Sequence, residues 1–286
     1  MRARLLTGIP MALATLGLLY ADFARGGFPW GLSVLYILGL TWGMKEYLQL
    51  QSLAGVRLPR VMLCGITALL SSAHILEIHQ ARPLLPADLS LPDALLVTTM
   101  VAWMCYEVVR GEADRFRHIA VLFLGLFYIW VLGSFSMKLR HLPRIGEAAF
   151  LWWMVANKTT DAWAYFTGKA FGRHKLIPKV SPAKTVEGGI GGLVLGCASG
   201  LLVWWFTPLR QEIPLVLFIP LSLLSQVVGQ FGDLVESLLK RHVTAKDSAA
   251  LLPGLGGVLD VIDSLLLSAP VTYYGIVIAI RLKGNL

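Results

Sequence analysis

Charged residues are scarce in this sequence. Only 15% of its 286 residues are charged, whereas soluble domains carry about 25%. Hydrophobic residues make up 56% of the chain, and the mean hydropathy is +0.67. These values exclude an ordinary soluble domain and favour a polytopic membrane protein. The pI of about 9.5 does not indicate a nucleic-acid partner, because Lys and Arg stand in short clusters between apolar runs, as topology signals do.

Cysteine is also scarce, and histidine shows no ligand spacing. Cys64, Cys105 and Cys197 each lie alone in an apolar run, so we interpret them as small buried hydrophobes without a disulfide framework. The six histidines have no paired spacing, which argues against a zinc site. Neither a G-x-S-x-G elbow nor a G-x-x-x-x-G-K-[ST] loop is present, so the sequence gives no sign of those hydrolase and NTPase classes.

Long apolar runs dominate what is present. A membrane-spanning helix needs roughly twenty apolar residues, and nine stretches come close to this: 4–22, 30–44, 61–78, 91–109, 119–135, 147–166, 189–206, 214–231 and 258–280. The first begins like a signal peptide, but it has no clear cleavage site and eight more spans follow, so we expect a retained helix. We therefore expect an all-α, polytopic integral membrane protein with about nine transmembrane helices.

We expect one membrane domain over residues 1–286, since no repeat or linker divides the chain. Residues 1–150 would supply N-terminal transmembrane helices, and residues 151–286 a C-terminal catalytic half. With the N-terminus inside, sixteen Lys and Arg residues fall on the cytoplasmic side and eight on the other. This asymmetry favours an N-in, C-out topology, although Lys138, Arg140 and Arg144 count against it. The loops 167–188 and 232–257 would then both face the cytoplasm.

Two aspartates open the last apolar run. Asp260 and Asp263 are three residues apart, so a helix places both carboxylates on one face. Two carboxylates that point the same way repel each other unless a cation lies nearby, and oxygen ligands of this kind suit Mg²⁺. The alternative is that they only cap a helix N-terminus, where the helix dipole favours negative charge. Just upstream, Gly254, Gly256 and Gly257 form either a phosphate-binding turn or an ordinary one.

A second acidic face is predicted in GDLVESLLKR, residues 232–241. Asp233, Glu236 or Ser237, and Lys240 recur at helical spacing. An exposed i,i+4 pair with Lys240 accounts equally well for Glu236. It accounts less well for Asp233, which follows Gly232 at the edge of an apolar span.

The preceding loop is basic. Its stretch SPAKTVEGG, residues 181–189, combines a turn, a lysine, hydroxyl groups and glycines, which are groups that bind phosphate oxygens. The alternative is a topology signal that attracts anionic lipid headgroups. Lys158 and Asp161 lie in the adjoining apolar run and need partners or a polar cavity there, because charges in a membrane span are costly.

Two long motifs resemble a known family. Residues 237–263 read S-L-L-K-R-x4-K-D-S-x4-P-G-x-G-G-x-L-D-x-x-D, and residues 161–192 read DAWAYFTGKAFGRHKLIPKVSPAKTVEGGIGG. Both are similar to the signatures of the phosphatidate cytidylyltransferases, also called CDP-diacylglycerol synthases, and the resemblance covers roughly residues 157–270. Two positions depart from it: Leu255 replaces the usual His, and Val261 the usual Arg.

The resemblance implies transfer of a cytidylyl group from CTP to phosphatidate, at the cytoplasmic face of an inner membrane. Expected metal ligands for Mg²⁺, with room for a second cation, are Asp233, Asp260 and Asp263. The expected catalytic residues are Asp233, Asp260, Asp263, Lys240, Lys246 and Asp247. The expected substrate-binding residues are Asp161, Ser181, Lys184, Thr185, Ser237, Arg241, Gly254, Gly256 and Gly257. Expected partners are CTP, phosphatidate and membrane lipids, with a homodimer left open and no nucleic acid.

Two alternatives stay open at this point. One is a related CTP-dependent membrane enzyme, acting on an isoprenoid lipid phosphate or as a lipid kinase. The other is a transporter or structural membrane protein with a polar cavity. A carrier would place its charges near the midplane on broken helices, whereas here they gather at one face, which favours an enzyme.

Overall fold

The computed structural model describes residues 10, 14, 15, 17, 18, 21, 22, 30–79, 90–111, 113–243 and 256–283. These residues are almost entirely helical. The chain divides into two compact units. The N-terminal unit comprises Met1–Ser134 with His242–Ile262, and the C-terminal unit comprises Phe135–Arg241 with Asp263–Leu286.

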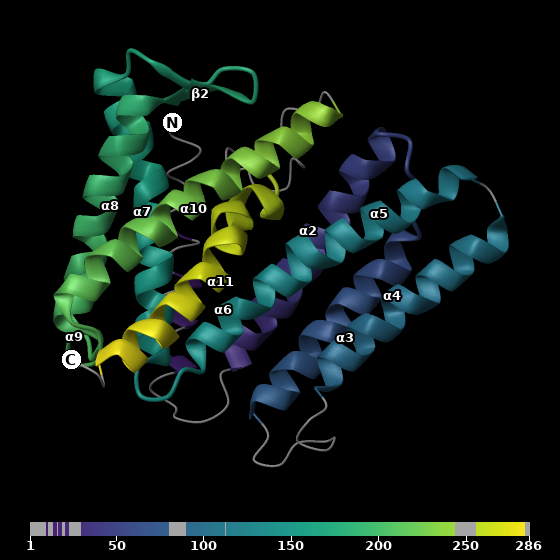
Figure 1. The fold of residues 1–286 in the computed structure, drawn as a ribbon, viewed down its shortest axis with the longest axis horizontal. Helices are drawn as coiled ribbons and strands as arrows, with labels where there is room; N and C mark the ends of the chain where they lie inside the picture. Colours follow the sequence, from purple (N-terminus) through teal and green to yellow (C-terminus); the bar gives the residue numbers. More distant parts are fainter. Residues whose placement is uncertain are drawn as a thin grey trace. The chain divides into compact units, whose positions relative to one another are not determined.

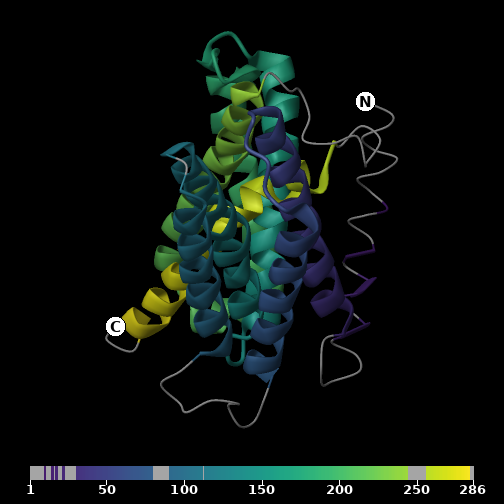
Figure 2. The same cartoon turned by 90° about the vertical axis from the view of Figure 1, so that its right-hand side faces the viewer.

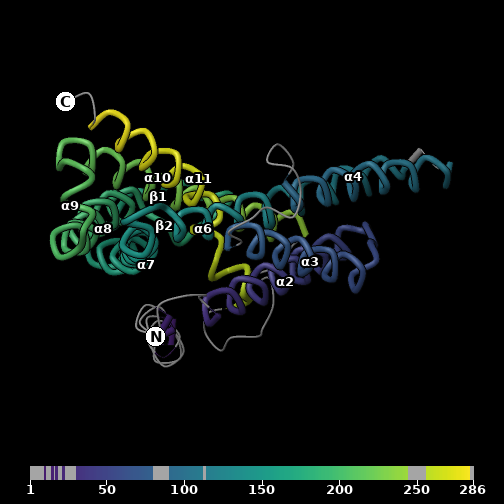
Figure 3. The backbone as a smooth tube through the Cα atoms, turned by 90° about the horizontal axis from the view of Figure 1, so that it is seen from below, coloured from purple at the N-terminus to yellow at the C-terminus, as the bar shows by residue number. Residues whose placement is uncertain are grey.

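The N-terminal unit is built from helices whose apolar runs match the expected ones. Its elements are α2 (Trp30–Leu53), α3 (Arg60–His79), α4 (Leu91–Arg110), the 3-10 turn η1 (Ala113–Arg115), α5 (Phe116–Gly125) and the π-helical stretch η2 (Leu126–Val131). Helices α2 and α3 lie side by side (Figure 3). Helix α6 (Leu132–Arg140) continues directly from η2.

Close packing inside this unit depends on a glycine, Gly125. Tyr47 of α2 is fully buried and donates a hydrogen bond of 2.9 Å to the Val121 carbonyl of α5. A Cβ on Gly125 would lie only 2.6 Å from the Tyr47 ring. The glycine therefore lets the ring lie flat against the helix that it crosses.

The C-terminal unit holds the longest helices and one hairpin. Its elements are α7 (Gly146–Phe171), β1 (Lys175–Ile177), β2 (Ser181–Thr185), α8 (Val186–Phe206), α9 (Leu209–Glu212), α10 (Leu215–His242) and α11 (Val258–Lys283). Strands β1 and β2 pair antiparallel and lie beyond the end of α7 and the start of α8 (Figures 1 and 2). The connection expected as a loop over 167–188 is thus mostly ordered as helix and hairpin.

Small residues bring α7 and α8 together. Gly188, Gly192, Gly196 and Gly200 recur every four residues along α8, so they form one face of the helix. A Cβ on Gly196 would lie 2.0 Å from the Thr160 hydroxyl of α7. A glycine face of this kind allows two membrane helices to pack with their backbones close together.

Polar side chains in the core of this unit bind one another. The Asn157 amide donates to Ser225 (3.2 Å), which pairs with Thr272 (2.7 Å), and Thr160 donates to Gln226 (2.7 Å). All five residues are buried. These bonds tie α7, α10 and α11 together, as buried polar groups of membrane helices do when they pair with one another.

Within the part of the chain that the structure describes, six helices are long and apolar enough to cross a membrane: Arg60–His79, Leu91–Arg110, Phe116–Arg140, Val186–Phe206, Leu215–His242 and Val258–Lys283. They match six of the nine expected stretches, which confirms a mainly α-helical membrane protein. The expected spans 30–44 and 147–166 lie in α2 and α7, which are long helices outside this set. Most of 4–22 lies outside the described residues, so the count of nine stays a prediction.

Candidate active site

Three carboxylates meet in the C-terminal unit. Asp233 and Glu236 of α10 and Asp263 of α11 each offer an oxygen, and these oxygens lie within 4.8 Å of one another. Glu236 is 0% exposed and Asp263 is 5% exposed, whereas Asp233 is half-buried. We call these three residues the carboxylate cluster. Three acidic groups so close in a mostly buried place repel one another unless cations lie beside them or one of them is protonated.

The geometry of α10 and α11 explains why the three acids meet. Asp233 and Glu236 are three residues apart on α10 and so share a face. Gly232 lies against the start of α11 in this unit, where a Cβ on it would come within 2.5 Å of the Asp263 carbonyl oxygen. The absence of a side chain at this position lets the two helix backbones approach, and the acids approach with them.

Two lysines neutralise part of this charge. The Lys184 ammonium, from the end of β2, lies 2.6 Å from Asp233, and Lys240 forms an ion pair with Glu236. The Ser237 hydroxyl also donates to Asp233, at 3.4 Å. The structure therefore joins five expected site residues to a sixth that was outside the expected set; the five are Asp233, Asp263, Ser237, Lys184 and Lys240.

Glu236 is that sixth residue. The sequence left it as one half of an exposed i,i+4 pair or as part of an acidic face. Glu236 does pair with Lys240. The prediction that this pair is exposed was wrong, because Glu236 is fully buried. The signal that could have placed it in the site is its spacing of three residues from Asp233.

A polar network links α7 to the carboxylate cluster. The Ser264 hydroxyl donates to Asp161 (3.1 Å) and accepts from Lys158 (3.0 Å), which lies 3.6 Å from Asp161. The Ser264 backbone N–H donates to the Asp263 carboxylate. Lys158 and Asp161 thus have the partners that charges in an apolar run require. Ser264 was not singled out in the sequence.

The hairpin residues have structural contacts of their own. Thr185 caps α8 by accepting from the Gly188 N–H (3.1 Å), as N-terminal threonines commonly do. Arg241 of α10 donates to the Val180 carbonyl (3.3 Å), which holds the hairpin turn near α10. Ser181 is half-buried on β2 and lies opposite Ile177 in the hairpin. These contacts place all three expected residues in one region with Lys184.

The start of α11, in the N-terminal unit, is surrounded by carboxylates. Glu46 of α2, only 1% exposed, accepts from the N–H groups of Val258 (3.0 Å) and Leu259 (2.8 Å). Asp260 accepts from the Gly257 N–H at 2.7 Å. Acidic groups stabilise a helix N-terminus in this way, so Asp260 has the capping contact that the sequence left as an alternative to metal binding.

Gly256 requires glycine on backbone grounds. Its φ is +91°, a conformation that side chains rarely adopt, and a Cβ there would lie 2.6 Å from Asp260. The Gly257 N–H group expected to bind phosphate is bonded to Asp260 instead in this structure. Lys246, Asp247, Gly254 and Leu255 lie outside the described residues. Val261 lies half-buried in α11.

Comparisons with known proteins agree with the motifs. The model of the cytidylyltransferase family matches residues 2–279. A phosphatidate cytidylyltransferase of Bacillus subtilis is 33% identical over 276 residues, which cover 96% of this chain and 97% of that protein. A phosphatidate cytidylyltransferase of Chlamydia pneumoniae is 33% identical over 201 residues, which cover 64% of this chain and 64% of that protein. The uncharacterized protein YnbB of Escherichia coli is 35% identical over 176 residues, 59% of this chain and 57% of that one.

The chain therefore belongs to the cytidylyltransferase family, as the motifs at 161–192 and 237–263 predicted. The match extends well beyond these motifs, because it includes nearly the whole N-terminal half.

Proposed function

We propose that this chain transfers the cytidylyl group of CTP to phosphatidate and releases pyrophosphate, giving CDP-diacylglycerol. The observation that carries the proposal is its near full-length correspondence to a relative of that name. The carboxylate cluster, with Lys184 and Lys240 paired to it, supports the proposal independently. Its three carboxylates outnumber its two lysines, so it suits a polyanionic substrate once a divalent cation is bound.

The reaction needs positioning and charge stabilisation more than it needs a base. A phosphate oxygen of phosphatidate, already ionised, attacks the α-phosphorus of CTP, and the bond from that phosphorus to the bridging β-phosphate oxygen breaks. Two polyanions must approach each other, and the leaving pyrophosphate carries away the negative charge. Fixed cations around the triphosphate therefore account for much of the proposed catalysis.

We assign phosphate binding to Lys184, Lys240 and Arg241, with Lys246 added from the motif. Asp233 and Glu236 hold the first two ammonium groups in place, so that little conformational freedom is lost when substrate binds. Lys240 is particularly restricted, since its side chain is 12% exposed and its partner is buried. Ser181, Thr185, Ser237 and the glycines at 254, 256 and 257 complete the proposed substrate contacts, while Asp161 and Asp247 stay proposed members of the site.

The carboxylate cluster also fits Mg²⁺. Its donors are hard carboxylate oxygens from two helices, within 4.8 Å of one another, and Mg²⁺ favours one or two such ligands together with substrate phosphates. Asp233 and Asp263 would hold the ion, and Glu236 joins them as a candidate ligand. Asp260, three residues before Asp263 in α11, stays in the proposed set through its spacing, and a second cation has room in such a ligand set. When bound, Mg²⁺ would neutralise triphosphate charge.

We also propose the finer membrane arrangement that the sequence predicts. It has nine spans, the N-terminus inside, and the site at the cytoplasmic face of a bacterial inner membrane. The charge asymmetry and the bacterial relatives support it. A homodimer stays a prediction that the mass of the detergent-solubilised protein would test.

Two labelled nucleotides test the function. Purified protein receives phosphatidate, Mg²⁺ and CTP labelled either at the α- or at the γ-phosphorus, and the label in the lipid extract is measured. The proposal predicts lipid-bound label from the α-position only. Label from the γ-position would instead identify a lipid kinase. Transfer to an isoprenoid lipid phosphate, but not to phosphatidate, would show the related enzyme, and no transfer to either would contradict cytidylyl transfer.

A further inference from the structure

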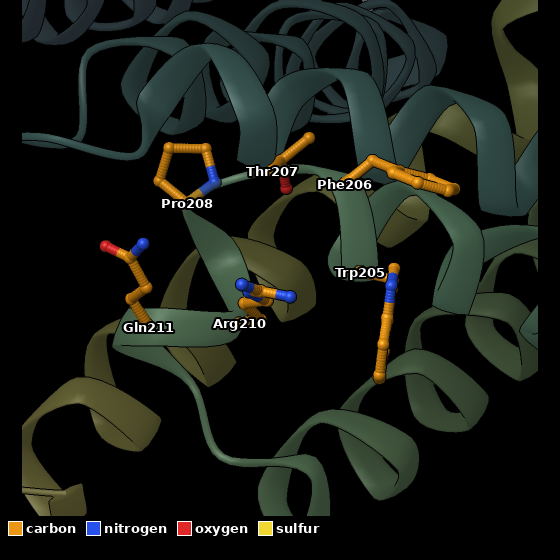
Figure 4. Close-up of a pocket in the computed structure, with 6 residues that line it drawn as sticks. All are labelled: Trp205, Phe206, Thr207, Pro208, Arg210 and Gln211. Atoms are coloured by element: carbon orange, nitrogen blue, oxygen red, sulfur yellow. The ribbon is translucent and has the colours of Figure 1, made fainter.

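A cavity of about 500 Å³ lies where α8 ends and α9 begins. Its lining residues come from the segment 205–211 without Leu209, and they are Trp205, Phe206, Thr207, Pro208, Arg210 and Gln211. Figure 4 shows their side chains around it. We call it the α8–α9 cavity.

The α8–α9 cavity is remote from the carboxylate cluster. Helix α8 begins at Val186, two residues after Lys184, and continues for 21 residues to Phe206. At 1.5 Å per residue the helix is about 30 Å long, the thickness of a hydrocarbon core. The carboxylate cluster is linked through Lys184 to one end of α8, and the α8–α9 cavity lies at the other end. The two sites therefore belong to opposite interfaces of the same membrane.

Arg210 gives the cavity a positive charge that no acid offsets among the described residues. Its guanidinium carbon lies 5.7 Å from the centre of the Trp205 ring, and it forms no ion pair in the part of the chain that the structure describes. The nearby acid, Glu212, is bound instead by Lys283 at 3.2 Å, and the same ammonium donates to the Gln211 carbonyl. An interfacial arginine that has no carboxylate partner favours binding of an anionic ligand.

One hydroxyl group of the lining residues also lacks a protein partner. The Thr207 hydroxyl is buried and has no hydrogen-bond partner in the structure, although buried polar groups almost always have one. The chain around the cavity is held by Trp204 of α8, whose indole donates to the Ile213 carbonyl (2.9 Å) and packs on Phe218 with ring centres 5.6 Å apart. The oxygen of this hydroxyl is closed to solvent, so a ligand oxygen would satisfy it only after the Thr207 side chain turns toward the cavity.

The rim is suited to hydrocarbon chains. Phe206 is 80% exposed, Leu202 62% and Trp205 58%, and all three belong to a helix that is apolar enough to span a membrane. Exposed apolar groups on such a helix face lipid. Tryptophan at the end of a span lies at headgroup level, which places Arg210 at the depth of lipid phosphates.

We propose that the α8–α9 cavity binds an anionic phospholipid of the leaflet opposite the carboxylate cluster. Arg210 contacts its phosphate, Thr207 and Gln211 supply hydrogen bonds, and its acyl chains lie over Phe206 and Leu202. This lipid is not the substrate of the proposed reaction, and the proposal stands whether or not the chain transfers cytidylyl groups. The simpler account is an interfacial anchor in which Trp205 and Arg210 have no preference among headgroups.

Native mass spectrometry distinguishes the two accounts. Purified full-length protein is released from membranes containing equal amounts of phosphatidylglycerol and phosphatidylcholine, and the retained lipids are counted. One nearby cation changes binding of an anionic lipid by about fivefold, so Arg210→Gln should lower the retained phosphatidylglycerol by about that factor. Arg281→Gln is the matched control: it removes the same charge from the end of α11, outside the cavity lining, and should retain the wild-type amount.

Equal retention of both lipids by wild type, or equal loss in Arg210→Gln and Arg281→Gln, would overturn the proposal in favour of simple anchoring. Glycerol 1-phosphate added during release identifies the source of the phosphate. If it displaces the lipid at millimolar concentration, the cavity is a site for soluble phosphate esters and the lipid assignment is wrong. Quenching by brominated phosphatidylglycerol gives a second readout, because Trp205→Phe should remove part of the wild-type quenching.

Discussion

The backbones of Gly232 and Asp263 are in direct contact. A Cβ on Gly232 would lie 2.5 Å from the Asp263 carbonyl oxygen and 2.9 Å from the Ser264 Cα. The residue after this glycine, Asp233, belongs to the carboxylate cluster with Asp263. The geometry of the proposed metal site therefore depends on the absence of one methyl group.

Gly232→Ala should spread the carboxylate cluster. The two helices must separate to accommodate the Cβ, and a misplacement of about 1 Å in a catalytic group lowers turnover by roughly 100-fold. Initial rates of CDP-diacylglycerol formation measure this, with the amount of protein in the membrane as the check on folding. Gly39→Ala is the control, because a Cβ at this helical position has nothing within 4 Å. Equal rates for both variants would show that the close approach has no role.

Glu236 and Lys240 should behave as a buried pair. Lys240→Gln leaves the fully buried Glu236 carboxylate without its ion-pair partner, which commonly costs about 3–5 kcal/mol. Thermal unfolding in detergent, followed by tryptophan fluorescence, should show a lower midpoint for Lys240→Gln. The double variant with Glu236→Gln should recover much of that stability but not the activity, since both charges serve the proposed site. Additive losses of stability in the double variant would contradict a coupled pair.

Ser264 should act as a positioning residue for the site. Ser264→Ala removes the hydroxyl that joins Asp161 and Lys158. The hydroxyl contacts no proposed metal ligand, while the backbone N–H that binds Asp263 stays in the variant, so its effect should not exceed the change of about 10-fold in metal affinity that follows loss of a contact made to a ligand itself. The Mg²⁺ concentration that gives half-maximal rate should rise accordingly, and Ser264→Thr should restore it. Ser199→Ala is the control, because Ser199 donates only within its own helix, to Leu195 (2.9 Å). An unchanged Mg²⁺ dependence in Ser264→Ala would show that the network is structural.

Variants of Asp260 and Glu46 should distinguish helix capping from metal binding. Both accept hydrogen bonds from N–H groups at the start of α11. Asp260→Asn and Glu46→Gln keep an acceptor oxygen but lose the charge that the helix dipole favours, so each should lower stability by about 0.3–2 kcal/mol. Only Asp260→Asn should also raise the Mg²⁺ requirement, because Asp260 alone is in the proposed ligand set. If both variants kept the wild-type Mg²⁺ dependence, Asp260 would be a cap and its metal assignment would be wrong.

The sequence predicted those parts of the site that lie in contiguous motifs. Helical spacing placed Asp233 and Lys240 on one face of a helix, two turns apart, and the resemblance joined them to Lys184 and Asp263. The structure brings these residues into ion pairs and a carboxylate cluster. Hydropathy predicted six of the membrane helices, because a twenty-residue apolar run is a local property.

What the sequence left open depends on contacts between distant segments. Glu46 precedes Val258 by 212 residues, and no local pattern connects a glutamate in α2 with the start of α11. The burial of Glu236 likewise depends on which neighbours cover α10. The hairpin over 175–185 was missed since its strands have 3 and 5 residues, too short for an alternating pattern to be recognised.

The most direct test of the central claim is the rate of CDP-diacylglycerol formation as a function of Mg²⁺ concentration in three proteins reconstituted in the same lipid. They are wild type, Asp263→Asn, and Asp93→Asn, whose carboxyl group is exposed in the first turn of α4. The account predicts Mg²⁺-dependent synthesis by wild type and Asp93→Asn. It predicts that Asp263→Asn loses roughly 100-fold or more in rate while staying folded. Wild-type synthesis that needs no divalent cation, or an Asp263→Asn enzyme as active as wild type at limiting Mg²⁺, would contradict it.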